Sequence, residues 1–315
     1  MNYFDLHCDT AYEMYAKKQP LSCNSLAVSL DGFDSYEKKV QIFAVWSENE
    51  KPAGDVYSDF FKIFDNLKQE IDKNSDRAVL CTDSAALLSD DKRLKIIPAV
   101  EGARLLEDDL SRLELLREKG VRVLVPAWKG VTPVSGAFDT DTGLTELGYK
   151  MVEKCEELGI ILDVSHLSEK GFWDLANVAK KPFIASHSNA MTVCNHPRNL
   201  SDTQLRTIVS HGGIAGINLV KEHLSKALTA ENPEGFDFDK VLETIVKHLL
   251  HFMEKGCEKN VCLGCDLDGT SPIKGLEKVS DIANIAKYMR SHGASASLVD
   301  DIFYNNAFSF FARNL

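Results

Sequence analysis

The chain lacks any long hydrophobic run. Among its 315 residues, no apolar stretch approaches the roughly 18 residues of a membrane-spanning helix. Residues 1–5 carry neither the basic segment nor the long apolar segment of a secretory signal, and the apolar residues at 308–315 are too few for a lipid-anchor signal. We therefore expect a cytoplasmic protein that is not bound to a membrane.

The chain also has fewer basic than acidic residues. Lys and Arg number 36 against 47 Asp and Glu, which gives a formal net charge of −11. An acidic surface disfavours nucleic acids and anionic membranes as main partners, and we expect neither. Solubility alone explains the acidic excess.

Two common motifs are missing. Among the eight cysteines only Cys262 and Cys265 have Cys-x-x-Cys spacing, and they lie within a strand-like run, so no zinc-finger site is formed. In a reducing compartment we expect the cysteines to be buried free thiols. No Gly-x-Gly-x-x-Gly follows a predicted strand, so a dinucleotide-binding sheet loses its usual sequence support. There is no flexible linker and no internal repeat, and we expect one domain over residues 1–315.

The chain contains short apolar runs that alternate with amphipathic segments. The expected strands are residues 3–6, 40–45, 96–100, 121–125, 160–164, 182–185, 213–218 and 261–264. The expected helices are 60–67, 110–119, 147–158, 171–179, 202–210 and 238–255, with further C-terminal helices within 276–315. This alternation predicts an α/β fold, a (β/α)8 TIM barrel; an open doubly wound sheet is the competing architecture.

A histidine and an acid two positions apart, His7 and Asp9, follow the first apolar run. Side chains at i and i+2 of a strand point the same way, so both could reach one metal ion. Imidazole and carboxylate are a normal partial ligand set for zinc. Such a pair is common in unrelated proteins, so further ligands are needed to support a metal site.

Four more predicted strands end in residues of the same kind. These residues are Glu101, His166, His187, and the pair Asp266 and Asp268. In a (β/α)8 barrel the C-terminal ends of the strands meet on the face that carries the active site. A single histidine there would be interpreted as structural, and a single acid as a helix cap, which remains an alternative for Asp268. Their joint presence favours chemistry.

Three histidines with two or three carboxylates exceed the three protein ligands of an ordinary catalytic zinc. They suit two metal ions about 3.5–4 Å apart, bridged by a carboxylate and a water of lowered pKa. A further carboxylate could take the proton of that water and pass it to the leaving group. The set is typical of metal-assisted hydrolysis.

In order and combination, these segments resemble the renal (membrane) dipeptidase family, dinuclear zinc peptidases of the metallo-dependent hydrolase superfamily. The resemblance covers about residues 3 to 311. It is carried by Asp5-Leu6-His7-Cys8-Asp9-Thr10, Val100-Glu101-Gly102, Asp163-Val164-Ser165-His166-Leu167-Ser168, Ala185-Ser186-His187-Ser188, His196-Pro197-Arg198-Asn199-Leu200 and Gly264-Cys265-Asp266-Leu267-Asp268-Gly269.

The resemblance implies metal ligands residue by residue. One zinc ion would be bound by His7 and Asp9, the other by His166 and His187, with Glu101 as the bridge. Mn²⁺ or Co²⁺ would also be accepted by such ligands. Relatives suggest a homodimer.

The resemblance also implies two residues that act on a dipeptide substrate. Asp266 would be the general acid/base. Arg198 would hold the free carboxylate of the substrate, since a guanidinium group matches that planar anion. Without the family context, a surface salt bridge is the simpler interpretation of Arg198.

One position departs from the family pattern. Family dipeptidases carry a histidine after the fourth barrel strand, which binds substrate and stabilises the developing oxyanion; here Trp128 occupies that place and Lys129 follows it. Oxyanion stabilisation is often worth on the order of 3 kcal/mol. Lys129 could supply a cation to the oxyanion or point to solvent. We expect the metal site to survive this change, and we count Trp128 among the substrate-binding residues.

Asn218, at the end of the seventh predicted strand, could contact substrate or serve as a cap. Other histidines lack a strand-end setting and are expected to be structural or on the surface; they are His196, His211, His223, His248, His251 and His292.

The primary hypothesis is a dinuclear zinc dipeptidase for short peptides with a free C-terminal carboxylate, with a D-residue allowed there. Two alternatives stay open. One is a metal-dependent hydrolase of another amide, a lactone or a phosphoester. The other is a catalytically silent barrel that keeps the metal site.

Overall fold

The computed structural model describes residues 1–48, 53–229 and 237–315. Its strands are β1 (Tyr3–Cys8), β2 (Lys39–Trp46), β3 (Ala78–Leu80), β4 (Leu94–Glu101), β5 (Val123–Val125), β6 (Ile161–Leu162), β7 (Ala215–Ile217) and β8 (Val261–Leu263). All pairings between these strands are parallel. Their order is β6-β5-β4-β2-β1-β8-β7, with β3 paired to β4 outside this path.

The segment at residues 182–185 lies between the two ends of this curled sheet. It is joined to β6 by a parallel bridge between Asp163 and Ile184, and to β7 by another between Ala185 and Ala215. Pro182 lacks an N–H group, which helps explain why this stretch pairs through isolated bridges only. Each expected strand thus has a counterpart in the sheet or in this linking segment, and the α/β barrel prediction is confirmed.

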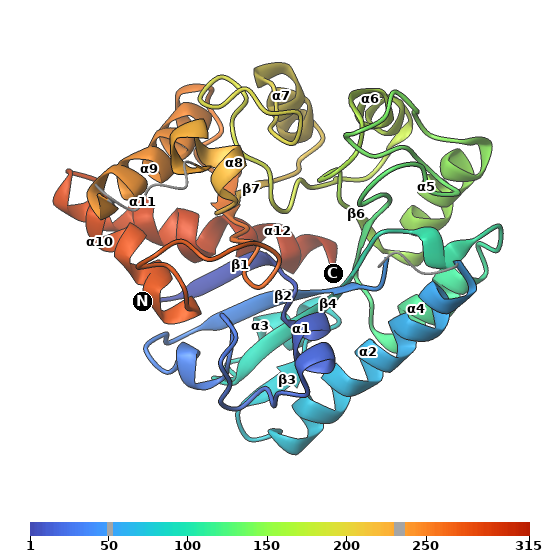
Figure 1. Ribbon diagram of the computed structural model, residues 1–315, viewed down its shortest axis with the longest axis horizontal. Coiled ribbons are helices and arrows are strands. Elements are labelled where there is room, and N and C mark those ends of the chain that lie inside the picture. Colours follow the sequence, from blue (N-terminus) through green and yellow to red (C-terminus); the bar gives the residue numbers. More distant parts are fainter. Residues whose placement is uncertain (49–52, 230–236) are drawn as a thin grey trace.

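Helices surround the strands in Figure 1. They are α1 (Thr10–Lys17), α2 (Ala53–Lys73), α3 (Ser84–Leu88), α4 (Arg112–Lys119), α5 (Glu146–Leu158), α6 (Glu169–Val178), α7 (Asp202–Ser210), α8 (Lys221–Leu224), α9 (Phe238–Glu254), α10 (Ala283–Ser291), α11 (Ala296–Asp300) and α12 (Asn306–Asn314). Short 3₁₀ turns η1 (Asp31–Phe33), η2 (Arg104–Leu106), η3 (Lys226–Thr229) and η4 (Val279–Ile282), and one π turn, η5 (Asp301–Asn305), complete the set.

The expected helices are confirmed, including those at the C-terminus. Helix α7 begins with a capping box in which Ser201 and Gln204 satisfy each other's backbone amides. Helices α1, α3 and α8 were not expected; α3 and α8, with 5 and 4 residues, are too short to establish a clear periodic pattern. Among the described helices, none combines the length and apolarity needed to cross a bilayer.

The barrel has two apolar layers. The larger lies between strands and helices, and the smaller fills the interior with side chains such as Phe4, Ile42 and Ile97. Helix α12 lies across the strands at the end opposite the catalytic face expected of such barrels, and Phe311 stacks on Phe4 with ring centroids 5.3 Å apart. Apolar contacts close this end of the barrel, and the polar side chains described below lie at the opposite end.

Replacing Phe311 by alanine should destabilise the fold without touching the polar end. Phe311 is 0% exposed, and truncation of a buried phenylalanine costs about 3–5 kcal/mol. Denaturant unfolding of Phe311→Ala measures this loss. The half-buried Phe308 is the control, and Phe308→Ala should cost clearly less; equal losses would contradict a sealing role for Phe311.

Candidate metal centre

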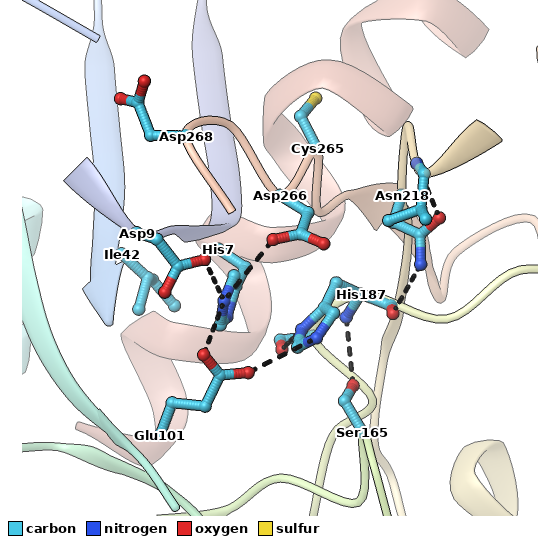
Figure 2. A network of polar contacts seen from close by, with 12 residues as sticks. His7, Asp9, Ile42, Glu101, Ser165, His187, Asn218, Cys265, Asp266 and Asp268 are labelled. Carbon is cyan, nitrogen blue, oxygen red and sulfur yellow. Dashed lines mark hydrogen bonds and ion pairs between the residues drawn. The ribbon is translucent and has the colours of Figure 1, made fainter. Parts of the chain in front are cut away.

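Six of the residues singled out in the sequence meet at the C-terminal ends of the strands. Figure 2 shows the side chains of His7, Asp9, Glu101, His187 and Asp266 directed toward one another. They come from the ends of β1, β4 and β8 and from the linking segment, and His166 joins them from the turn after β6. Two sets of potential ligand atoms each lie within 4.8 Å of one another: His7, Glu101 and His187, and His7, Asp9 and Asp266.

A bulge on β1 aims His7 at this centre. Between Asp5 and Cys8, β1 advances three residues while β2 advances from Gln41 to Phe43 only. The extra residue interrupts strict alternation, so His7 can face the same interior as Leu6. The backbone N–H of His7 donates a hydrogen bond to the Asp5 carboxylate at 2.9 Å, so a side chain satisfies this amide. The pairing of His7 with Asp9 therefore depends on this bulge as well as on the two-residue spacing.

Glu101 is the hub of the cluster. One oxygen, Oε2, lies 3.6 Å from His7 Nε2, while Oε1 lies 3.1 Å from His166 Nε2 and 3.7 Å from His187 Nε2. His7 Nε2 is also 3.3 Å from Asp9 Oδ2 and 3.9 Å from Asp266 Oδ1. The two Glu101 oxygens thus face two different groups of ligands, as a bridging carboxylate requires.

Hydrogen bonds on the far side of the rings orient His166 and His187. His166 Nδ1 lies 3.0 Å from the Trp128 carbonyl oxygen, which can only accept, so Nδ1 carries the proton and Nε2 of the neutral ring keeps its lone pair. His187 Nδ1 is held 2.7 Å from Ser186 Oγ. The two Nε2 atoms lie only 2.8 Å apart. A cation bound between the two rings would take the place of this direct contact between two nitrogen atoms.

The acids and histidines of the cluster shift one another's proton affinities. Burial and the nearby Glu101 raise the pKa of Asp9 to about 6, and burial and Asp9 raise the pKa of Asp266 well above its ordinary value. Burial opposes ionisation of Glu101 too, but His7 and His166 hold its pKa well below the usual range. Burial and Arg198 lower the pKa of His166 to about 4, which leaves it neutral and able to bind metal.

Two of these residues adopt the left-handed backbone conformation. His166 has φ = 73° and Asp266 has φ = 60°. A residue with a Cβ pays about 1–2 kcal/mol for this conformation, and such outliers cluster at functional sites. Both residues lie in the turn after a strand, where the conformation directs the side chain back over the barrel.

Two glycines make room for the backbone that carries His187. A Cβ added to Gly264 would lie 1.7 Å from the Ser186 carbonyl oxygen, and one added to Gly216 would lie 2.1 Å from the same atom. Ser186 can therefore cross close to β7 and β8 only because both positions lack a side chain. This close approach places His187 over the centre of the barrel.

Arg198 lies beside the cluster as a buried cation. It is 5% exposed, and its guanidinium stands over the Phe138 ring at 5.7 Å from the centroid. Burial lowers the pKa of Arg198 to about 10, although Asp266 and Glu101 oppose the shift. Among the described residues it makes no ion pair, so its charge remains available to an anion.

The other predicted substrate contacts are placed differently. The half-buried Trp128 packs edge-to-face on Trp46 with ring centroids 5.0 Å apart, while its carbonyl orients His166. The Lys129 side chain is exposed. Asn218 is fully buried, and its amide donates to the His187 carbonyl at 2.9 Å and accepts from Asn189 at 2.8 Å (Figure 2). Its polar atoms are therefore used to hold the His187 turn.

Asp268 and Cys265 point away from the cluster in Figure 2. The Asp268 carboxylate accepts from Thr10 Oγ1 at 2.6 Å and from the Ala27 amide at 2.7 Å, so it secures the loop after α1. All eight cysteines are free, and Cys23 is exposed whereas the others are buried. The expectation of buried free thiols is therefore confirmed except at Cys23.

Glu48 is an acid of this face that sequence reasoning missed. It follows β2, is 6% exposed, and accepts from the Arg104 amide at 2.8 Å. Burial raises its pKa to about 7, with a further contribution from Glu101. Its position three residues beyond the predicted strand at 40–45 was the available signal. His223, expected to be structural or on the surface, is buried, lies against His196 with ring centroids 4.4 Å apart and is hydrogen-bonded to Asn218, which agrees with a structural role.

Comparison with known proteins places this geometry in a family. The model of the membrane dipeptidase family, peptidase family M19, matches residues 1–313. The chain belongs to the membrane dipeptidase family. It is therefore a hydrolase of a metallopeptidase family, and the family implies binding of a divalent metal. The cluster described above contains groups that could hold such an ion.

Several proteins of known structure are similar to this member of the membrane dipeptidase family. A metallopeptidase from Rhodobacter sphaeroides, solved with a phosphinate mimic of the dipeptide L-Ala-D-Ala, is 25% identical with a TM-score of 0.91, over 100% of this chain and 99% of that one. Dipeptidase AC, a family M19 metallopeptidase, is 27% identical with a TM-score of 0.90, over 100% and 98%.

A curated relative from Klebsiella pneumoniae, an uncharacterized protein in the pqqA 5′ region, is 33% identical over 76% of this chain and 90% of its own length. Three further curated relatives are matched over 50% to 57% of their own length.

Placing a methyl group at Gly264 should disturb the His187 turn. In Gly264→Ala the new Cβ would overlap the Ser186 carbonyl, and overpacking of this kind costs about 1–3 kcal/mol or more. We expect a lower free energy of unfolding together with weaker binding of divalent metal. Gly256→Ala is the control, because a Cβ there meets no atom within 4 Å and adds only backbone strain. Unchanged metal binding in Gly264→Ala would contradict the proposed close approach.

Proposed function

We propose that the chain is a single-domain dipeptidase that binds two zinc ions, with Mn²⁺ or Co²⁺ as possible substitutes, and hydrolyses dipeptides with a free C-terminal carboxylate. The observation that carries this proposal is the convergence of three histidines and three carboxylates beside a buried arginine that has no ion-pair partner among the described residues. The proposed ligands are His7 and Asp9 for one ion, His166 and His187 for the other, and Glu101 between them.

The chemistry and positions of these residues fit divalent cations, independently of the family match. His7 Nε2 is buried without a hydrogen-bond partner among the described residues, although imidazole nitrogens are normally satisfied when buried. The Nε2 atoms of His166 and His187 lie 3.1 Å and 3.7 Å from the same Glu101 oxygen. Nitrogen and carboxylate donors without thiolate suit zinc, manganese or cobalt.

When bound, such metals lower the pKa of a water molecule and polarise the scissile carbonyl group. Asp266 is the proposed proton carrier. It lies beside the ligands at 3.9 Å from His7 Nε2, and burial with Asp9 raises its pKa, so it can hold a proton and donate it. In this role Asp266 accepts the proton of the attacking water and delivers it to the leaving amine.

Arg198 is the proposed anchor for the C-terminal carboxylate of the substrate. A buried guanidinium without an ion pair among the described residues favours binding of a planar anion, and the fixed position over Phe138 limits its rotation. The Rhodobacter sphaeroides relative binds a mimic of L-Ala-D-Ala, which supports a D-residue at this position. Anchoring the carboxylate places the scissile bond at a fixed distance from the metal ligands.

Trp128 remains a proposed substrate contact. With Trp46 it forms an aromatic wall at the ends of β2 and β5, suited to the apolar part of a short peptide. The exposed Lys129 side chain gives no support to a role as oxyanion partner. Without the family histidine, the bound metals have to supply more of the oxyanion stabilisation.

A substrate panel with defined metals tests the function. We expect turnover of L,L- or L,D-dipeptides in the presence of Zn²⁺, and in Asp266→Asn a loss of about 10²–10⁴-fold in kcat while bound metal is unchanged. The amide of asparagine keeps the shape of the side chain but cannot shuttle the proton. Turnover is followed by release of the free amino acid, and metal content by elemental analysis.

Other outcomes of the panel would replace this proposal. Hydrolysis of phosphoesters or lactones but not of dipeptides would assign a different metal-dependent hydrolase. Bound metal with no turnover of any substrate would assign a silent barrel. Full activity of Asp266→Asn would remove Asp266 from the mechanism.

Removing the arginine should erase discrimination between dipeptides and dipeptide amides. A hydrogen bond to a charged group contributes about 1.5–3 kcal/mol, so Arg198→Met should lower kcat/KM for the free carboxylate by roughly 10- to 150-fold. The already poor amide substrate should change little. Arg206, exposed on α7, is the control, and Arg206→Met should keep the discrimination. Equal losses for both substrates would contradict the anchor.

A further inference from the structure

Two buried aspartates lie beneath the ligand cluster and have none of the roles above. Asp5 and Asp163 are both 0% exposed. Each accepts hydrogen bonds from backbone amides on two neighbouring strand ends. We propose that Asp5 and Asp163 are positioning residues that set the spacing of the metal ligands, a proposal that rests on the metal site proposed above.

Asp163 joins the two turns that carry His166 and His187. Its Oδ1 accepts from the Ser165 amide and from the Ser186 amide, both at 2.9 Å. Ser165 directly precedes His166, and Ser186 directly precedes His187. One carboxylate oxygen therefore fixes the separation of two turns whose imidazole Nε2 atoms lie 2.8 Å apart.

A serine hydroxyl strengthens the same link. Ser165 Oγ accepts from the His187 amide at 3.1 Å, as Figure 2 shows. The strand ladder is thin here, because β6 has only two residues and the linking segment at 182–185 pairs through isolated bridges. Asp163 supplies hydrogen bonds that a longer strand would supply through its backbone.

Asp5 plays the equivalent part on the other side of the barrel. Its Oδ1 accepts from the His7 amide at 2.9 Å, and its Oδ2 accepts from the Cys265 amide at 2.9 Å. Cys265 directly precedes Asp266. The Gln41 side chain donates to Asp5 Oδ1 at 3.0 Å and fixes the carboxylate on β2. Asp5 thus ties the bulge that aims His7 to the turn that presents Asp266.

The two aspartates share a second feature. The amide of Ser165 and the amide of Cys265 each lie one residue before a left-handed residue, His166 and Asp266 respectively. These hydrogen bonds fix the amides next to the left-handed residues, so they can stabilise turns that contain an unfavourable φ. Glu101 needs no such support, because β4 is paired with β2 without interruption from Val40 to Trp46.

The negative charge of Asp163 is a competing explanation, since a carboxylate near the metals would attract them without acting as a clamp. Asp163→Asn separates the two effects. The asparagine oxygen can still accept from both amides, and its NH₂ group would take the place of Oδ2, which has no hydrogen-bond partner among the described residues. Asp163→Ala removes the clamp and the charge together.

Equilibrium dialysis against buffered Zn²⁺, with bound metal counted per chain, is the test. We expect two ions in the wild type, and in Asp163→Ala about 10- to 100-fold weaker binding of one of them, the range typical for loss of a residue that orients metal ligands. Asp163→Asn should bind both with close to wild-type affinity. Ser165→Ala, a milder change, should weaken the same ion by less.

Leu162→Ala is the matched control for a general loss of stability. Leu162 precedes Asp163 on β6 and is 3% exposed in the core, and its truncation leaves the amide hydrogen bonds in place. This variant should unfold more easily but keep both ions. Unchanged binding in Asp163→Ala, or equal losses in Asp163→Asn and Asp163→Ala, would overturn the clamp. Wild type without metal, or full metal binding in His187→Ala, would instead overturn the metal site itself.

Discussion

Repulsion among three buried carboxylates is the constraint on which the rest of this molecule depends. Asp9, Glu101 and Asp266 are each less than a tenth exposed and gather around His7. Such a group is costly in a folded chain unless cations neutralise it. Burial and mutual repulsion already show in the raised pKa values of Asp9 and Asp266. Hydrogen bonds at the polar end of the barrel hold the strand ends that carry these groups in place.

One end of the barrel stabilises the fold, and the other end carries the candidate metal centre. Apolar side chains under α12 seal one end, where Phe4 and Phe311 stack, and add to the burial that stabilises the chain. At the other end, left-handed residues, glycines without space for a methyl group and orphaned polar atoms all lower stability. A barrel tolerates this arrangement because the strand ends are fixed by the sheet, so local strain at the mouth does not spread to the core.

The sequence predicted the barrel well, because short apolar runs in a parallel sheet are buried on both faces and stand out from amphipathic helices. It also brought together His7, Glu101, His166, His187 and Asp266, since strand ends meet on one face. It could not show the bulge between Asp5 and Cys8, which changes no residue type and alters only which face His7 occupies. It also could not show Asn218 turned toward the His187 carbonyl, because a strand-end amide suits a substrate contact equally well.

Charge balance links the number of metals to the kind of substrate. Counting only the carboxylates of Asp9, Glu101 and Asp266 in their ionised forms, one divalent ion together with Arg198 would balance their three negative charges without an excess of positive charge to attract an anion. A second divalent ion makes the mouth positive, and the potential of a buried site extends further than it would in water. In the proposed binding mode, the free carboxylate of a dipeptide would meet both Arg198 and this favourable field, whereas a peptide extended beyond that carboxylate would place a neutral amide there. The proposed preference for a free carboxylate would thus follow from the same acids that are proposed to gather around the metals.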